Sequence, residues 1–126
     1  IMDVIDYGEP VTTKGLNMLY GPGNDLVSAT ALTAAGAHMV LFSTGRGTPF
    51  GAPAPTLKIA TNSQLAARKK TWIDFNAGVV ADGERTLDEA GADLYRLVLD
   101  VASGKQTCAE KKGFREISIF KDGVVL

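Results

Sequence analysis

The fold class follows from one stretch of the chain, Met39-Val40-Leu41-Phe42-Ser43-Thr44-Gly45-Arg46-Gly47-Thr48. Its first four residues are apolar without alternation, which is typical of a central strand covered on both faces. A turn with two glycines and one arginine follows, and residues 43–55 as a whole are rich in Gly and Pro, which indicates a loop. The stretch therefore predicts a buried strand that ends in a glycine-rich loop.

Short apolar runs and helical stretches alternate on both sides of this strand. Strands are predicted at 16–20, 56–60, 71–75 and 117–120, with a turn at Lys121-Asp122-Gly123. Helices are predicted from the N-cap Asn24 to about Gly36, over 63–70, and from Thr86 to Gly104. Such alternation is typical of βαβ units. We therefore expect an α/β fold, a three-layer Rossmann-like domain with a mainly parallel sheet flanked by helices.

The helix that starts at Thr86 has the clearest signals. Thr86 and Glu89 have the spacing of a capping box, in which each side chain binds a backbone N–H of the other's turn. One apolar stripe follows at helical spacing, formed by Leu87, Ala90, Leu94, Leu97, Val98 and Val101. Gly104 is a typical residue for the end of such a helix.

Length and composition limit the classes of function. The 126 residues suit a single domain, and 45% hydrophobic residues allow a substantial core. The net charge of −1 and the lack of a long basic cluster argue against nucleic-acid binding. A single cysteine, Cys108, fits a reducing compartment, and the apolar runs are too short to span a bilayer. We expect a soluble, cytoplasmic protein.

Polar and glycine residues follow four of the predicted strands, at 21–24, 43–48, 61–63 and 76–78. In an open parallel sheet the carboxyl ends of the strands share one edge, and ligands bind outside that edge. We therefore predict a substrate-binding site there, formed by Asn24, Thr44, Gly45, Arg46, Gly47, Thr48, Asn62 and Asn76.

The chemistry of these residues favours an anionic, hydroxylated ligand. Arg46 can bind a carboxylate through two parallel hydrogen bonds, and Gly45 and Gly47 allow backbone N–H groups to come close. Hydroxyl and amide side chains suit a polyol. Three alternatives stay open: residues 21–23 form only a tight turn, Asn62 only caps a helix, or Arg46 pairs with a surface carboxylate.

The remaining reactive residues do not assemble into a catalytic set. His38, the single histidine, precedes the central strand and is expected at the edge away from the site. Cys108 has no second Cys or His at metal-ligand spacing, so it is interpreted as a packing thiol. Asp74 and Asp82 do not form an acid/base pair by themselves. Catalytic residues and metal ligands are therefore left unassigned.

TGRGTPFG at 44–51 and KIATNS at 58–63 are the most specific segments of the chain. Together they resemble the C-terminal region of the altronate dehydratase and galactarate dehydratase family. YGPGND at 20–25, GAHMVLF at 36–42, WIDFNAG at 72–78 and FREISIFK at 114–121 add to the resemblance, which covers nearly the whole chain from about Tyr7. It implies a single C-terminal domain, 1–126, of a longer sugar-acid dehydratase.

The resemblance also implies an activity, a cofactor and partners. The activity is loss of water from altronate or a related sugar acid to give a 2-keto-3-deoxy acid, with a divalent metal, usually Fe²⁺. A small N-terminal domain and a middle domain of the same enzyme are the implied partners, and the metal ligands are expected there, so that this part alone is expected to be inactive. Homo-oligomers are possible.

Two other functions are weighed against this one. In the first, the chain is a structural or oligomerisation domain with no ligand site of its own, which predicts an exposed apolar patch. In the second, the α/β pattern belongs to a nucleotide-binding domain. The glycine fingerprint of such domains is missing from the chain, which makes the second alternative poor.

Overall fold

A computed structural model describes residues 1–120 of the chain. The elements are, in chain order, β1 (Asp3–Ile5), β2 (Asn17–Leu19), α1 (Asp25–Ala34), β3 (Val40–Thr44), β4 (Thr56–Ala60), α2 (Ser63–Arg68), β5 (Phe75–Asn76), α3 (Gly78–Ala81), α4 (Leu87–Ala102) and α5 (Cys108–Lys111). Within the described part, no helix is long and apolar enough to cross a membrane.

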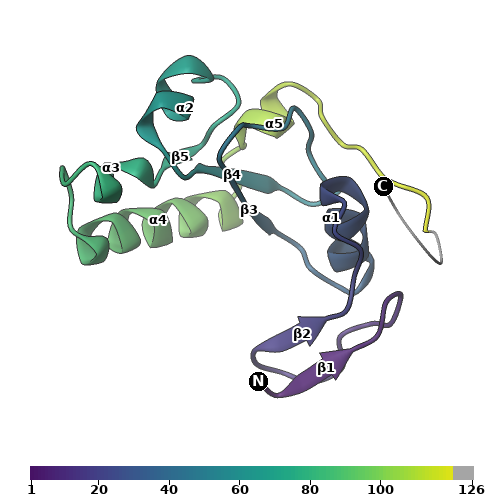
Figure 1. The fold of residues 1–126 in the computed structure, drawn as a ribbon. Coiled ribbons are helices and arrows are strands. Elements are labelled where there is room, and N and C mark those ends of the chain that lie inside the picture. Colours follow the sequence, from purple (N-terminus) through teal and green to yellow (C-terminus); the bar gives the residue numbers. More distant parts are fainter. Residues whose placement is uncertain (121–126) are drawn as a thin grey trace.

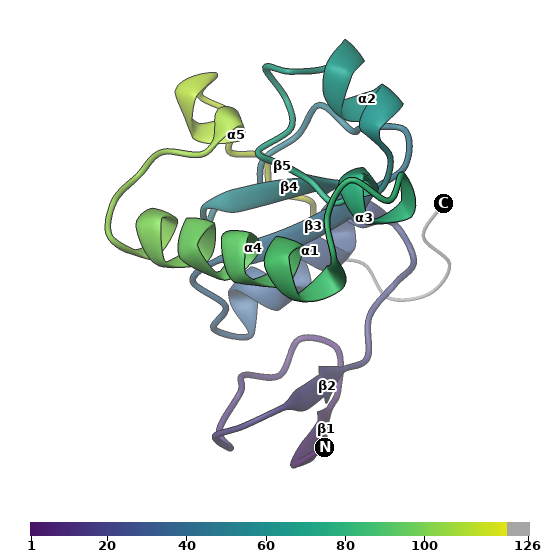
Figure 2. The same ribbon diagram turned by 90° about the vertical axis from the view of Figure 1, so that its left-hand side faces the viewer.

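The main sheet contains β3, β4 and β5 in that order, and all three strands are parallel. Val40 pairs with Thr56 and Thr44 with Ala60, so β3 and β4 lie in register along their whole length. Helix α4 lies in front of this sheet and α1 behind it (Figure 2). The α/β class, with a parallel sheet between layers of helices, is therefore confirmed.

A second sheet corrects the expectation of a single one. β2 pairs in parallel with β1, a strand that the sequence pattern did not predict, and not with the main sheet. This N-terminal sheet stands apart from β3–β5 (Figure 1). The apolar run at 16–20 identified a strand correctly, but a run of apolar residues carries no information about its pairing partner.

Two other predicted strands differ from the structure. Residues 71–74 form a turn, because the Lys69 carbonyl oxygen accepts from both Trp72 N and Ile73 N, and the chain therefore keeps turning after α2. Residues 117–120 form no strand; single hydrogen bonds hold this segment, such as Ser118 N to Thr30 Oγ1 at 3.0 Å. The predicted turn at 121–123 lies outside the described residues.

The helix boundaries agree closely with the sequence signals. Asn24 caps α1, and Gly36 follows its end with a φ of 115°, the left-handed conformation that favours glycine. The Thr86–Glu89 capping box opens α4, as predicted. The apolar stripe of α4 is only partly covered, since Ala90 and Val101 are buried whereas Leu87 is 74% exposed.

Two apolar clusters hold the helices against the main sheet. Ala29 of α1 packs with Val40, Phe50 and Ala52, and Phe42 and Phe50 meet edge to face with ring centroids 5.1 Å apart. The second cluster joins Ala60, Leu65 and Ile73 beneath α2. Because both clusters lie against β3 and β4, they fix the strands whose ends carry the predicted site.

Candidate functional site

The ends of β3, β4 and β5 meet at one edge of the main sheet, as predicted for three of the four segments. Thr61 N donates to Thr44 O at 3.0 Å, and Ala77 N donates to Ala60 O at 2.9 Å, so the residues after each strand stay in contact. This edge brings together Thr44, Gly45, Arg46, Gly47, Thr48, Asn62 and Asn76.

Asn24 does not belong to this edge, which corrects the fourth segment. Its strand, β2, lies in the N-terminal sheet, so its end is not aligned with those of β3–β5. The Asn24 side chain caps α1, and its Oδ1 accepts from Leu26 N at 3.1 Å and Val27 N at 3.2 Å. The prediction assumed that all four strands share one sheet, and the pairing of β2 with β1 breaks that assumption.

The amide side chains at the edge tie the strand ends to one another. Asn62 Oδ1 accepts from Leu65 N at 2.8 Å, as a helix cap, and its Nδ2 donates to Gly45 O at 3.1 Å. Asn76 Nδ2 donates to Ser63 Oγ at 2.9 Å, and its Oδ1 accepts from Gly78 N at 3.0 Å. These amides therefore have structural partners, and they order the edge.

A basic pocket of about 280 Å³ opens beside this edge. Its lining residues are Gly45, Arg46, Asn62, Gln64, Leu65, Arg68 and Lys69. None of them is acidic, and the three ion pairs among residues 1–120 involve neither Arg46 nor Arg68. Both guanidinium groups are thus available to an anion, and the alternative that Arg46 pairs with a surface carboxylate is not supported within the described part.

Arg68 and Lys69 line the pocket but are not among the site residues predicted from the sequence. The six residues of α2 return the chain to the loop after β3, and Lys69 Nζ reaches Arg46 O at 3.0 Å. The only signal in the sequence was the basic run at 68–70. The return of α2 to the loop after β3 is a tertiary feature, which a sequence pattern does not show.

Gly47 shows how closely Lys69 packs on the loop. Its φ is 81°, and a Cβ added there would lie 3.0 Å from Lys69 Cδ. Gly47 N donates to Thr44 Oγ1 at 2.9 Å, which closes a tight turn around Arg46. A glycine is therefore required both by the backbone conformation and by the space that Lys69 occupies.

Behind the loop lies a buried group of polar side chains. Lys58 is 1% exposed, and burial lowers the pKa of its ammonium, an effect that the carboxylates of Asp74 and Glu116 oppose. Burial also raises the pKa of the Cys108 thiol, and the Asp74 carboxylate raises it further. The neutral thiol agrees with the interpretation of Cys108 as a packing residue.

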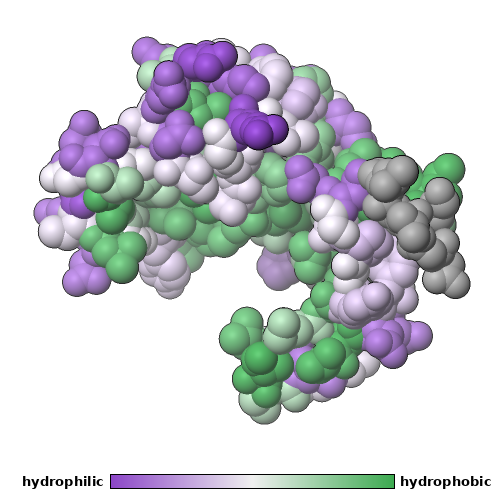
Figure 3. All heavy atoms as spheres, in the orientation of Figure 1, coloured by the Kyte–Doolittle hydropathy of each residue, from purple (hydrophilic) through white to green (hydrophobic). Residues whose placement is uncertain are grey.

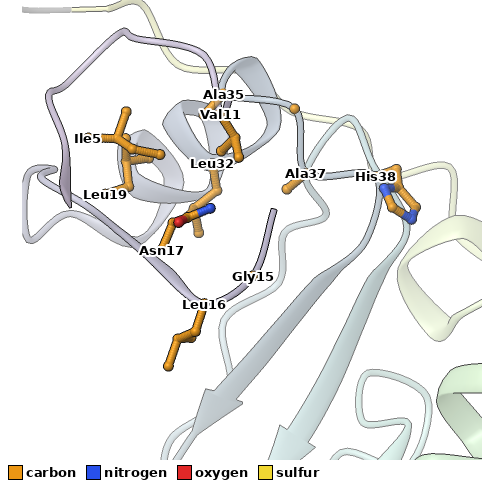
Figure 4. Close-up of a pocket in the computed structure, with 11 residues that line it drawn as sticks. Ile5, Val11, Gly15, Leu16, Asn17, Leu19, Leu32, Ala35, Ala37 and His38 are labelled. Carbon is orange, nitrogen blue, oxygen red and sulfur yellow. The ribbon is translucent and has the colours of Figure 1, made fainter. Parts of the chain in front are cut away.

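His38 is exposed and lies just before β3, at the opposite end of that strand from the loop. It lines a second, mostly apolar pocket of about 370 Å³ between the N-terminal sheet and the end of α1 (Figure 4). Asn17 lines it too, and Asn17 Oδ1 is the one buried side-chain atom among residues 1–120 that lacks a hydrogen bond. The pocket has no acid/base pair.

The implied metal does not fit the described residues alone. Across residues 1–120 there is no group of three or more His, Cys, Asp or Glu side chains that could hold a metal ion. The basic pocket would also repel a cation, since its charged lining residues are Arg46, Arg68 and Lys69. A metal site would therefore need ligands from outside this part of the chain, and Fe²⁺ stays a prediction.

The family described as D-galactarate/Altronate dehydratase, C-terminal, matches residues 1–125. The chain belongs to this family. The match confirms the resemblance that rested on the segments at 44–51 and 58–63, and the basic pocket therefore lies on a domain of this family.

Individual members of this family are similar to the chain over nearly its whole length. Altronate dehydratase from Escherichia coli (strain K12) is 54% identical over 126 residues, which is 100% of this chain and 25% of that protein. Altronate dehydratase from Bacillus subtilis (strain 168) is 48% identical over the same length. Galactarate dehydratase (L-threo-forming) from E. coli K12 is 39% identical over 128 residues. The chain spans about a quarter of the length of these curated relatives.

Proposed function

We propose that this domain binds the carboxylate of a sugar acid, so that the complete enzyme can remove water from it. The observation that carries the proposal is the pocket beside β3 and β4, which contains Arg46, Arg68 and Lys69 and no acidic residue. An arginine in such a place can hold a carboxylate through two parallel hydrogen bonds. Altronate is the proposed substrate, because two of the relatives are named altronate dehydratases.

The proposed chemistry is a β-elimination. A base removes the proton on the carbon next to the carboxylate, the electrons pass into an enolate, and the β-hydroxyl leaves as water with help from an acid. Negative charge grows on the carboxylate during the first step, and a cation held against it stabilises the transition state. Arg46 is the proposed cation on this chain. The base, and a divalent metal such as Fe²⁺, are proposed to come from the rest of the enzyme.

The substitution Arg46→Ala tests the proposal. It should be made in the full-length enzyme, in which this domain is joined to the other domains that its relatives contain. The loss of a bidentate, charge-assisted contact should raise KM for altronate about 10- to 100-fold or abolish turnover. Arg96→Ala is the matched control, since Arg96 is exposed on α4 and pairs only with Asp93 among the described residues. Equal kinetics of the Arg46 and Arg96 variants would refute the role of Arg46.

A second function, assembly, is supported by the exposed apolar surface. Figure 3 shows hydrophobic residues on the N-terminal sheet and along the side of the molecule that faces it. Those on the N-terminal segment are Ile1, Met2, Val4, Val11, Leu16, Met18 and Tyr20; those beyond it include Leu41, Leu87, Tyr95 and Leu99. Within the described part, β3 also has no strand on its outer edge. Apolar surface of this extent marks an interaction site.

We propose that the other domains of the enzyme, or a second copy of it, cover this surface. The substitution Met18→Lys should weaken that association, which sedimentation at several concentrations would measure, without changing the fold seen by circular dichroism. A chain that stays monomeric and shows no affinity for the other domains would refute the assembly role. We also propose a cytoplasmic location, because the single cysteine of this domain fits a reducing compartment.

A further inference from the structure

We propose that Lys58 and Lys69 are positioning residues, which hold the 44–48 loop by its carbonyl oxygens and thereby turn its N–H groups toward an anion. The inference rests on the proposed function, because it concerns the same pocket. It assigns a role to two lysines, of which Lys69 lines the pocket and Lys58 lies buried behind the loop. Their role is to fix the backbone around Arg46.

The carbonyl oxygens of the loop are hydrogen-bonded one after another. Their donors and distances are Thr61 N to Thr44 O at 3.0 Å, Asn62 Nδ2 to Gly45 O at 3.1 Å, Lys69 Nζ to Arg46 O at 3.0 Å and to Gly47 O at 3.2 Å, and Lys58 Nζ to Thr48 O at 2.6 Å. Five successive carbonyls therefore face β4 and α2. Lysine ammonium groups bind three of the five.

Three backbone N–H groups of the same loop have no acceptor among residues 1–120. Apart from Gly47 N, which donates to Thr44 Oγ1, no acceptor within residues 1–120 takes the backbone N–H of Gly45, Arg46 or Thr48. Successive free backbone N–H groups in a turn form a concave site for anions. The arrangement therefore adds backbone donors to the two guanidinium groups of the pocket.

Lys58 holds the loop from inside the domain. It lies in the middle of the central strand β4 and is 1% exposed, and its Nζ lies 5.5 Å from the centre of the Phe50 ring. Among the described residues, Thr48 O is the only hydrogen-bond acceptor of this ammonium. A buried cation is costly unless its partners compensate for lost hydration. A charge in this place is best explained by its contact with the loop.

Lys69 holds the loop from the side of α2. Its ammonium lies 4.5 Å from the centre of the Trp72 ring, which fixes the side chain over the loop. The adjacent Lys70 is exposed and makes no hydrogen bond or ion pair within residues 1–120. Lys70 carries the same charge next to Lys69 but has no hydrogen bond to the loop within residues 1–120, so it serves as a control for Lys69.

Hydrogen exchange of the Gly47 amide, which donates to Thr44 Oγ1, tests the inference without any ligand. In Lys69→Met this amide should exchange about tenfold faster, because the two charge-assisted bonds that hold the loop are lost, while the amides of β4 stay unchanged. Lys69→Arg should restore most of the protection, and Lys70→Met should have no effect. Exchange rates in Lys69→Met equal to those in Lys70→Met would overturn the inference. Lys58→Met is not used alone, since loss of a buried residue can unfold the domain.

A second measurement separates positioning from mere stability. In the complete enzyme, Lys69→Met should raise KM for altronate about tenfold, with kcat nearly unchanged, because it disturbs substrate binding. If Arg46→Ala raises KM and Lys69→Met does not, the inference is overturned. If the loop loosens in Lys69→Met but Arg46→Ala leaves KM unchanged, the proposed function fails, while the contact of Lys69 with the loop is supported.

Discussion

Gly78 lies directly against the backbone of Ser63, where the ends of β5 and β4 meet. A Cβ atom added to Gly78 would come within 3.0 Å of Ser63 N and also of the Asn62 backbone. Gly78 N also donates to Asn76 Oδ1 at 3.0 Å. A glycine is therefore needed at position 78, because only a residue without a side chain lets the ends of β4 and β5 touch beside the pocket.

Gly78→Ala should destabilise the domain. The added methyl group meets backbone atoms, which cannot rotate away, so a cost of about 1–3 kcal/mol or more in the free energy of unfolding is expected. Urea unfolding would measure it. Gly91→Ala is the control, since Gly91 lies inside α4 with nothing within 4 Å of the added Cβ, and it should stabilise by about 0.5–1 kcal/mol. A Gly78 variant as stable as the wild type would show that the contact relaxes easily.

Cys108 should make the stability of the domain fall at alkaline pH. Burial, together with the Asp74 carboxylate, raises the pKa of the thiol above its ordinary value of 9.0. The folded state therefore retains a proton that the unfolded state loses. The stabilisation that the protonated thiol contributes is fully present below pH 9.0, and it is lost as the pH rises through the higher pKa of the folded state.

The Cys108→Ser substitution isolates this effect. Lys58 has the opposite effect on the pH dependence of stability. Burial lowers the pKa of its ammonium, so the free energy of unfolding rises with pH in the window below 10.5. Lys58 is present in both proteins, so the difference between their unfolding free energies reports the thiol. That difference should shrink between pH 8 and pH 11. A constant difference over this range would mean that the pKa of Cys108 is the same in both states.

Thr86→Ala should loosen the start of α4. Glu89 N donates to Thr86 Oγ1 at 3.3 Å, and Thr86 N donates to Glu89 Oε2 at 2.9 Å. Loss of such a cap should lower Tm by about 4 °C near neutral pH. Thr71→Ala, at an exposed turn residue without a side-chain hydrogen bond among residues 1–120, should leave Tm unchanged.

The effect of Thr86→Ala should also depend on pH. The hydrogen bonds from Thr86 lower the pKa of the Glu89 carboxyl below 4.5. The contribution of the Glu89 carboxylate to the cap is therefore fully present above pH 4.5 and is lost as the pH falls through the lower folded value. Melting curves at pH 7 and pH 3 would test this. An equal Tm difference at both pH values would show that the Glu89 carboxylate does not contribute to the cap.

Local features could be predicted wherever the physical cause is local. Asn24 and Thr86 were predicted as helix caps because a capping side chain reaches only two or three residues along the chain. The strand at 56–60 was predicted with the bounds that β4 has. In contrast, residues 71–74 were predicted as a strand, and the double hydrogen bond to Lys69 O, which shapes them into a turn, left no trace in the apolar pattern.

The sequence by itself determined the α/β class, the glycine-rich loop after β3 and the family, since these depend on residue types at fixed spacings. Only the tertiary structure decided which strands share a sheet, and so separated Asn24 from Arg46. Only the tertiary structure brought Lys58 and Lys69 under the same loop. Lys58 binds the carbonyl oxygen of Thr48, 10 residues away in the chain, and Lys69 binds that of Gly47, 22 residues away. Strand pairing and contacts between distant residues depend on how the whole chain packs, so no short segment encodes them.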